Sequence, residues 1–198
     1  MPSWPLFALS NVLVFVVFWI LFVRLRQLQQ LLFFDLQTGL RAGRLFEKDA
    51  ALLCRTATSI AVYMIDLDDF RAFNAEGYHQ GDRALSTAAS ALQSCIRRST
   101  DFLYRKHDAG DEFLILLSVR NPDEAHTFAE RFHLALFAAH VPGSIGYVYS
   151  KPDSEQTPAD ERRTANRLLD SAEKHLKEAK KRGKNQVCPA LPEPPSSP

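Results

Sequence analysis

The sequence lacks the cysteine pattern of a disulfide framework or a zinc site. Its 198 residues contain only Cys54, Cys95 and Cys188. No two of them form a CxxC motif, and none has the Cys/His spacing of a metal finger. The sequence therefore argues against both classes of small, cross-linked domain, and three thiols with this spacing fit the reducing cytosol.

An excess of charge of one sign is also missing. The chain has 24 Lys and Arg residues against 23 Asp and Glu residues, a formal net charge of +1. Because nucleic-acid-binding domains are usually strongly basic, we expect no nucleic-acid partner. With 46% hydrophobic residues, a chain of this length can bury one ordinary core.

The N-terminal part contains a long apolar run. Residues 5–23 carry no charged side chain, and as a helix they would span roughly 29 Å, close to the thickness of a bilayer core. No basic segment precedes this run and no small-x-small site follows it, which favours a transmembrane helix over a cleaved signal peptide. Arg24 and Arg26 follow directly, so we expect a single-pass protein of the inner membrane with the rest of the chain in the cytoplasm.

Four leucines continue from this run at alternating steps of four and three residues. They are Leu21, Leu25, Leu28 and Leu32. This spacing is typical of the seam of a parallel coiled coil, and confinement to a membrane would favour the dimer. The seam is shorter than two heptads, so a connecting helix whose leucines pack on the following domain remains an equal alternative.

The sequence therefore divides into four regions. The expected boundaries are 1–23 for an N-terminal tail and transmembrane helix, 24–34 for a helical linker, 35–187 for a globular domain and 188–198 for a disordered Pro-rich tail. Within the domain we expect helices over 45–53, 85–96, 121–136 and 157–182, strands over 60–65, 102–105, 114–117 and 144–149, and a turn through Gly77 and Gly81. This order predicts an α+β fold, a ferredoxin-like or palm-type antiparallel sheet with flanking helices, whose first and third strands are central.

Acidic side chains lie at the ends of those two central strands. Residues 66–69 (DLDD) follow the first strand, and Asp111 and Glu112 precede the third, after a reversal at Gly110. Either cluster alone is common in a solvated turn. Together at one edge of a sheet they offer the hard oxygen ligands that magnesium needs in phosphoryl chemistry. An EF-hand is excluded because residues 66–77 have no Gly at the sixth position and no Glu at the twelfth.

Six segments, in order, resemble the GGDEF domains, the diguanylate cyclases that join two GTP molecules into cyclic di-GMP. They are residues 35–40 (DLQTGL, similar to DxLTGL), 66–71 (DLDDFR, similar to DxDxFK), Asn74, Gly81 with Asp82, 109–113 (AGDEF) and 179–185 (AKKRGKN, similar to AKxxGRN). Any one of these motifs is weak, whereas the ordered set is specific. The resemblance covers about residues 35–185.

The resemblance implies a role for each matched residue. The implied catalytic residues are Asp111 and Glu112, and the implied metal ligands are Asp66, the Leu67 carbonyl, Asp111 and Glu112, holding two Mg²⁺ (or Mn²⁺) ions per GTP. The implied substrate-binding residues are Asn74, Asp82, Phe70, Arg71, Lys180 and Lys184. In the implied reaction a ribose 3′-hydroxyl attacks the α-phosphate of the other GTP, so each subunit supplies half a site and a homodimer is required.

A further pattern and several departures qualify this resemblance. Arg98 and Asp101 fit the RxxD pattern of the family's inhibitory site for cyclic di-GMP. Ala109 replaces the first Gly of the signature, and the connection from Asp101 to Ala109 is two residues longer than usual. Other replacements are Gln37 for Leu, Arg71 for Lys and Tyr78 for His. The sequence therefore favours a diguanylate cyclase over three alternatives: an impaired domain that senses cyclic di-GMP or GTP, a cyclase that uses another nucleotide such as ATP, and a structural membrane protein without a ligand, against which the acidic pair argues.

Overall fold

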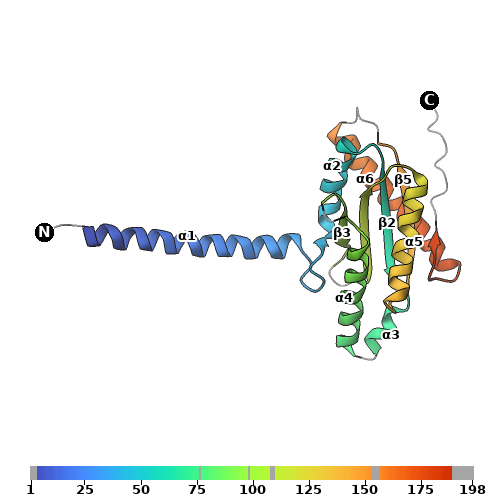
Figure 1. The fold of residues 1–198 in the computed structure, drawn as a ribbon, viewed down its shortest axis with the longest axis horizontal. Helices are drawn as coiled ribbons and strands as arrows, with labels where there is room; N and C mark the ends of the chain where they lie inside the picture. Colours follow the sequence, from blue (N-terminus) through green and yellow to red (C-terminus); the bar gives the residue numbers. More distant parts are fainter. Residues whose placement is uncertain (1–3, 76, 98, 108–109, 153–156, 189–198) are drawn as a thin grey trace. The chain divides into compact units, whose positions relative to one another are not determined.

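The computed structural model describes residues 4–75, 77–97, 99–107, 110–152 and 157–188 (Figure 1). The chain forms two separate units, Met1–Phe34 and Asp35–Pro198. The first contains one uninterrupted helix, α1 (Trp4–Phe33), on which Leu21, Leu25 and Leu28 are all more than half exposed. Among the described residues, no helix combines the length and the apolar character needed to cross a bilayer. The expected transmembrane helix is therefore not confirmed.

The second unit is built on one six-stranded sheet. In spatial order the strands are β1 (Arg41–Ala42), β3 (Phe102–Arg105), β4 (Glu112–Ser118), β2 (Ile60–Leu67), β5 (Gly143–Ser150) and β6 (Val187–Cys188). The four longer strands pair antiparallel with β2 and β4 at the centre, which confirms the ferredoxin-like order. The short edge strands β1 and β6 pair parallel, so the sheet is mixed and the prediction of a wholly antiparallel sheet is wrong. Two-residue strands have no periodicity that a sequence could reveal.

Helices connect and cover these strands. They are the 3₁₀ helix η1 (Gly43–Leu45) and the α-helices α2 (Phe46–Thr56), α3 (Phe70–Ala75), α4 (Tyr78–Ser94), α5 (Pro122–Ala138) and α6 (Pro158–Lys181). The predicted starts of α5 and α6 are confirmed: the Asn121 side chain accepts a hydrogen bond from the Glu124 N–H, and Thr157 forms a capping box with Asp160. The predicted turn at Gly81 is wrong, because Gly81 lies inside α4.

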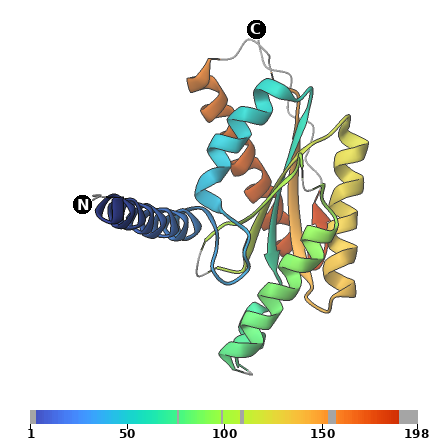
Figure 2. The same ribbon diagram turned by 60° about the vertical axis from the view of Figure 1, so that its left-hand side comes forward.

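The helices cover both faces of the sheet (Figures 1 and 2). Along β2, alternate residues such as Tyr63 and Ile65 pack with α4 and α5, while Val62 and Met64 pack with α2 and α6. Both faces of β2 are therefore buried, which explains its continuous apolar sequence. Because side chains alternate along a strand, Asp66 lies in the same row as Val62 and Met64, on the face that α6 covers.

A glycine allows α6 to pack directly on the sheet. A Cβ atom at Gly146 of β5 would lie 2.0 Å from the Leu176 backbone nitrogen and 2.3 Å from the Ala172 carbonyl oxygen. Only a residue without a side chain permits so close an approach. The last turn of α6, which carries Lys180, is thereby fixed over the face that contains Asp66.

Candidate active site

Two carboxylates face each other across the two central strands. Asp66, near the end of β2, is the cross-strand partner of Glu112 at the start of β4. The backbone N–H of Leu67 also donates to the Asp111 carbonyl oxygen (3.3 Å). The sequence-based expectation that the two acidic clusters meet at one edge of the sheet is confirmed. Like charges directly opposite one another destabilise a sheet, so this pair indicates a site kept for function.

The surroundings of Asp66 shift the pKa of its carboxylate. It is buried, and burial raises its pKa above the usual value, with Asp111 and Glu112 raising it further and Lys180 lowering it. The Lys180 Nζ atom lies 2.5 Å from Asp66 Oδ1. Beyond this ion pair, Asp66 Oδ1 accepts no hydrogen bond from the described residues. The carboxylate is thus placed where a positive charge stabilises its ionised form.

The donor atoms at this edge of the sheet are of the chemical type that binds a hard cation. Asp66, Asp111, Glu112 and the Leu67 carbonyl offer oxygen only, which is what Mg²⁺ and Mn²⁺ prefer. The buried Asp66 Oδ1, paired only with a lysine, fits such an ion. Within the described part of the chain, however, no three His, Cys, Asp or Glu side chains are close enough together to hold a metal. The structure therefore places these donors at the same edge of the sheet, but it does not arrange them as a complete set of metal ligands.

The other two aspartates of the first cluster have structural partners. The Asp68 carboxylate accepts hydrogen bonds from Ser144 Oγ (2.9 Å) and from the Asn185 backbone N–H (2.7 Å). Asp69 pairs with Lys184 at 2.6 Å. These contacts attach the segment after α6 to the end of β2, so residues 66–69 divide into one carboxylate facing the site and two that position its surroundings.

The hairpin between β3 and β4 supplies a cation that sequence analysis missed. Lys106 Nζ lies 3.4 Å from Glu112 Oε2 and 3.8 Å from Glu173 Oε2 on α6. His107 Nε2 is 3.8 Å from the same Glu112 oxygen. Both residues belong to the lengthened connection. The buried Arg105 shapes that connection by donating to the Gly110 carbonyl oxygen, and it lies over the Phe113 ring.

The predicted guanine contacts lie on α3 and α4. A Cβ atom at Gly81 would approach Asn74 Oδ1 to 2.0 Å and Phe70 Cζ to 3.3 Å, so the Asn74 amide lies directly against α4. The next residue, Asp82, is exposed and accepts a hydrogen bond from Gln37 Nε2. Arg71 is exposed on α3. Asn74 and Gly81 are thus brought together, and Gln37 is a neighbour of Asp82 that sequence analysis had noted only as a departure.

Comparison with known proteins decides the family. The model of the diguanylate cyclase GGDEF domain matches residues 32–186. The chain belongs to the GGDEF family. The GGDEF domain is 30% identical over 137 residues to MucR of Pseudomonas aeruginosa, a bifunctional diguanylate cyclase and cyclic di-GMP phosphodiesterase, covering 65% of this chain and 18% of that protein. It is 30% identical over 156 residues to the diguanylate cyclase DosC of Escherichia coli, covering 72% of this chain and 31% of DosC. The chain thus spans less than a third of either relative's length.

Solved structures agree with this fold. The coiled coil and GGDEF domain of DgcB from Caulobacter crescentus, solved in complex with c-di-GMP, superposes with a TM-score of 0.70 at 19% identity, covering 91% of this chain and 98% of that one. A sensory box/GGDEF family protein from the same organism has a TM-score of 0.62 at 30% identity, covering 76% of this chain and 99% of that one. The likeness to DgcB shows the fold alone.

The region of the predicted product site in this GGDEF domain is only partly described. Arg98 lies outside the described residues, as does Ala109 of the signature. The buried Asp101 carboxylate accepts hydrogen bonds from the Arg97 backbone (2.8 Å), the Arg97 guanidinium and Thr100 Oγ1. Arg97 in turn donates to the Ser118 carbonyl oxygen (2.6 Å). Asp101 therefore closes the turn before β3, and its role toward cyclic di-GMP stays a prediction.

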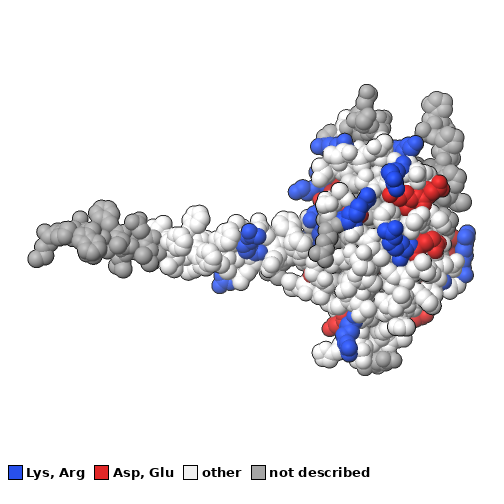
Figure 3. All heavy atoms as spheres, in the orientation of Figure 1, with Lys and Arg blue, Asp and Glu red and all other residues white. Residues whose placement is uncertain are grey.

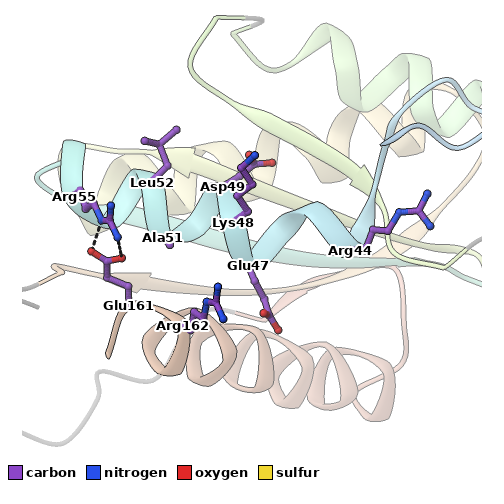
Figure 4. Close-up of a pocket in the computed structure, with 9 residues that line it drawn as sticks. All are labelled: Arg44, Glu47, Lys48, Asp49, Ala51, Leu52, Arg55, Glu161 and Arg162. Carbon is purple, nitrogen blue, oxygen red and sulfur yellow. Dashed lines mark hydrogen bonds and ion pairs between the residues drawn. The ribbon is translucent and has the colours of Figure 1, made fainter. Parts of the chain in front are cut away.

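A cavity of about 490 Å³ lies between α2 and α6 of the GGDEF domain, and none of the predicted site residues lines it (Figure 4). Its lining residues are Arg44, Glu47, Lys48, Asp49, Ala51, Leu52, Arg55, Glu161 and Arg162. Arg55 donates two hydrogen bonds to Glu161, at 2.5 and 2.6 Å. The charges that line this cavity are of both signs, and basic and acidic side chains are likewise interspersed on the face of the domain in Figure 3.

Proposed function

We propose that the protein is a diguanylate cyclase that condenses two GTP molecules into cyclic di-GMP and releases two pyrophosphates. The observation that carries this proposal is the meeting of Asp66, Asp111 and Glu112 at the end of the two central strands, beside Lys180. Membership of the GGDEF family supports it independently. A binding domain without chemistry has no physical need for facing carboxylates in a buried position.

The residues have separate tasks in this proposal. Asp66, the Leu67 carbonyl, Asp111 and Glu112 would hold two Mg²⁺ ions per GTP, and these ions would supply positive charge to the transferring phosphoryl group. Glu112 accepts the proton of the attacking 3′-hydroxyl. Lys180, Lys184 and Arg71 stabilise the triphosphate as charge develops on it. Asn74 and Asp82 bind the edge of guanine, with Phe70 beside them.

The reaction needs two domains that face each other, and the leucine seam of α1 can provide the pairing. Leu21, Leu25 and Leu28 are each 55–61% exposed on the single chain, so their side chains are accessible to the same helix of a second copy. We propose a homodimer in which this seam orients the two halves of the active site. Sedimentation of the full chain and of a Leu25→Asp, Leu28→Asp variant tests this: the variant should be monomeric and inactive, and an active monomer contradicts the proposal.

We further propose that residues 5–23 anchor the protein to the inner membrane, with the catalytic domain in the cytoplasm. The support is the uncharged run of these residues and the arginines that follow it. Fractionation of cells that express the full chain provides the test. Resistance to carbonate extraction supports the anchor, and recovery of the full chain in the soluble fraction excludes it.

The test of catalysis uses the full chain with its leucine-rich helix. Incubation with GTP and Mg²⁺ should yield cyclic di-GMP and pyrophosphate, and Asp111→Ala should abolish both products. ATP in place of GTP should give no cyclic product. A dimeric wild-type preparation that makes no cyclic di-GMP from GTP rules the proposal out.

One observation favours an alternative, a catalytically impaired domain that senses cyclic di-GMP or GTP. Lys106, from the lengthened hairpin, forms an ion pair with Glu112. It therefore competes with a metal ion for a proposed metal ligand. Calorimetry with cyclic di-GMP on the wild type and on Arg98→Ala distinguishes the two. Tight binding that is lost in the variant, without synthesis from GTP, identifies a sensor.

A further inference from the structure

Gln37 is held against the edge of the predicted purine site by a well-defined turn. The Thr38 backbone N–H and hydroxyl both donate to Asp35 Oδ1, at 2.7 and 2.5 Å. The Asp35 N–H donates to the Leu40 carbonyl oxygen (2.8 Å), and Gly39 adopts φ +68°, which glycine allows without strain. Asp35 itself is buried. This turn fixes the backbone of Gln37 while its side chain extends to α4.

The Gln37 side chain ends on the carboxylate of Asp82. Its Nε2 atom donates to Asp82 Oδ1, across 45 positions of sequence. Asp82 is exposed on the first turns of α4, and a cavity of about 360 Å³ opens beside it, lined also by His79, Arg83, Ser86 and Thr87. An exposed Asp without such a donor would rotate freely among its rotamers. The Gln37 amide therefore selects one orientation of a carboxylate that is open to a ligand.

Orientation matters because recognition of guanine by a carboxylate needs both oxygens at once. Guanine presents N1–H and N2–H₂ side by side, and each carboxylate oxygen has two lone pairs, so Oδ1 can accept from Gln37 and from the base together. A leucine, the residue that the family pattern has at this position, cannot donate to Asp82. The glutamine also keeps a carbonyl oxygen of its own as an additional acceptor next to the carboxylate.

We propose that Gln37 is a specificity-determining residue of the purine site, which orients Asp82 toward the N1–H and N2–H₂ groups of a guanine nucleotide. This inference rests on the proposed GTP site and deepens it. It assigns to the turn at the start of the domain a part in selecting the base. The effect should be largest for the exocyclic amino group, since that group requires the second acceptor.

Binding of non-hydrolysable analogues tests this without dependence on turnover. The probes are the α,β-methylene triphosphates of guanosine and inosine, titrated calorimetrically in Mg²⁺; inosine lacks the N2 amino group. Wild type should prefer the guanosine analogue. Gln37→Leu should reduce that preference about tenfold, as expected for one hydrogen bond to a charged group, while the inosine analogue binds almost unchanged. Gln37→Glu, which cannot donate when ionised, should reduce the preference at least as much.

Thermal unfolding of each variant verifies that the fold persists, and Asp82→Asn is the reference for complete loss of the preference. If Gln37→Leu weakens the binding of both analogues equally, or of neither, Gln37 has only a structural role. The inference then fails, while the proposed GTP site stands. If the wild type binds neither analogue, both the inference and the proposed function fail.

Discussion

The ammonium group of Lys180 lies 2.5 Å from Asp66 Oδ1 and so joins the last turn of α6 to the end of the central strand β2. Burial and the neighbouring carboxylates raise the pKa of Asp66, and this lysine opposes them. The contact places a cation beside a buried carboxylate at the point where the two acidic segments meet. Removal of the Lys180 ammonium group should therefore affect both phosphate binding and the ionisation of Asp66.

Lys180→Met should lower the rate of cyclic di-GMP synthesis about 100-fold, the usual effect of losing one positioned charge in an active site. The acid limb of the pH–rate profile should move to higher pH, because Asp66 loses the partner that lowers its pKa and must still be ionised. Lys181→Met is the matched control on the exposed neighbouring position. An unchanged profile would show that the ion pair has no part in the reaction.

Lys106→Ala should lower the magnesium concentration that the proposed synthesis of cyclic di-GMP requires. Lys106 lies 3.4 Å from Glu112, and its loss frees a carboxylate for the ion. The two side chains of this ion pair are 16% and 24% exposed, and such a partly solvated pair contributes on the order of 1 kcal/mol, so the Mg²⁺ concentration for half-maximal synthesis should fall about threefold. Lys177→Ala, which removes a lysine paired with Glu173, is the control. A higher magnesium requirement in Lys106→Ala would mean that the lysine supports Glu112.

Gly81→Ala should weaken nucleotide binding more than it weakens the fold. The added methyl group would meet Asn74 Oδ1 at 2.0 Å, and the flexible amide can move away at little cost. Loss of the hydrogen bonds proposed from the Asn74 amide to the base should reduce GTP affinity about tenfold. Asn74→Ala should have a similar effect, and the double variant should be no worse than either single one. Ser90→Ala, exposed on the same helix, should bind GTP as the wild type does.

Gly146→Ala should be among the most destabilising single substitutions in the domain. Its Cβ atom would lie 2.0 Å from the Leu176 backbone nitrogen, and neither α6 nor β5 can move without disturbing the core. We expect the free energy of unfolding to fall by about 3 kcal/mol, measured by urea denaturation. Gly110→Ala, whose new methyl group would meet only ordinary contacts from 3.6 Å, should change it little.

The Arg55–Glu161 pair should give the domain a pH-dependent stability. The hydrogen bonds from Arg55 lower the pKa of Glu161 below its usual 4.5, so the folded state favours the ionised form. The pair's contribution is therefore present above pH 4.5 and is lost as the pH falls further. Glu161→Gln should be less stable than the wild type at pH 7, and the difference should shrink in acid. A difference that persists below pH 3 would assign the effect to packing.

Local signals in the sequence predicted the parts of the fold that depend on them. Asn121-Pro122 and Thr157-Pro158 are helix starts whose capping groups lie within four residues, so no tertiary information is needed. The adjacency of β2 and β4 followed from the order of elements, because few topologies place four strands and two helices in that order. That adjacency is what brought Asp66 and Glu112 into one prediction.

Contacts between distant segments were not predictable in this way. Glycine usually interrupts a helix, and Gly81 is tolerated in α4 because Asn74 needs the space that a side chain would fill. The partners of Glu112 and Asp82, Lys106 and Gln37, depend on distances across the folded domain. In the sequence, Gln37 and the longer connection that contains Lys106 are departures from the family pattern. Only the structure shows which residues they contact.

The carboxylates and the guanine contacts of the proposed site lie on different kinds of secondary structure. Asp66 and Glu112 belong to the innermost strands, where every neighbouring residue of β2 is buried, whereas Asn74, Gly81 and Asp82 stand on outlying helical turns. The backbone geometry of such a frame is robust, since the central strands open only when the whole domain unfolds. Base selection in the proposed cyclase is modular, in contrast: mutation can change which purine is bound without altering the strands that would carry phosphodiester formation and pyrophosphate release.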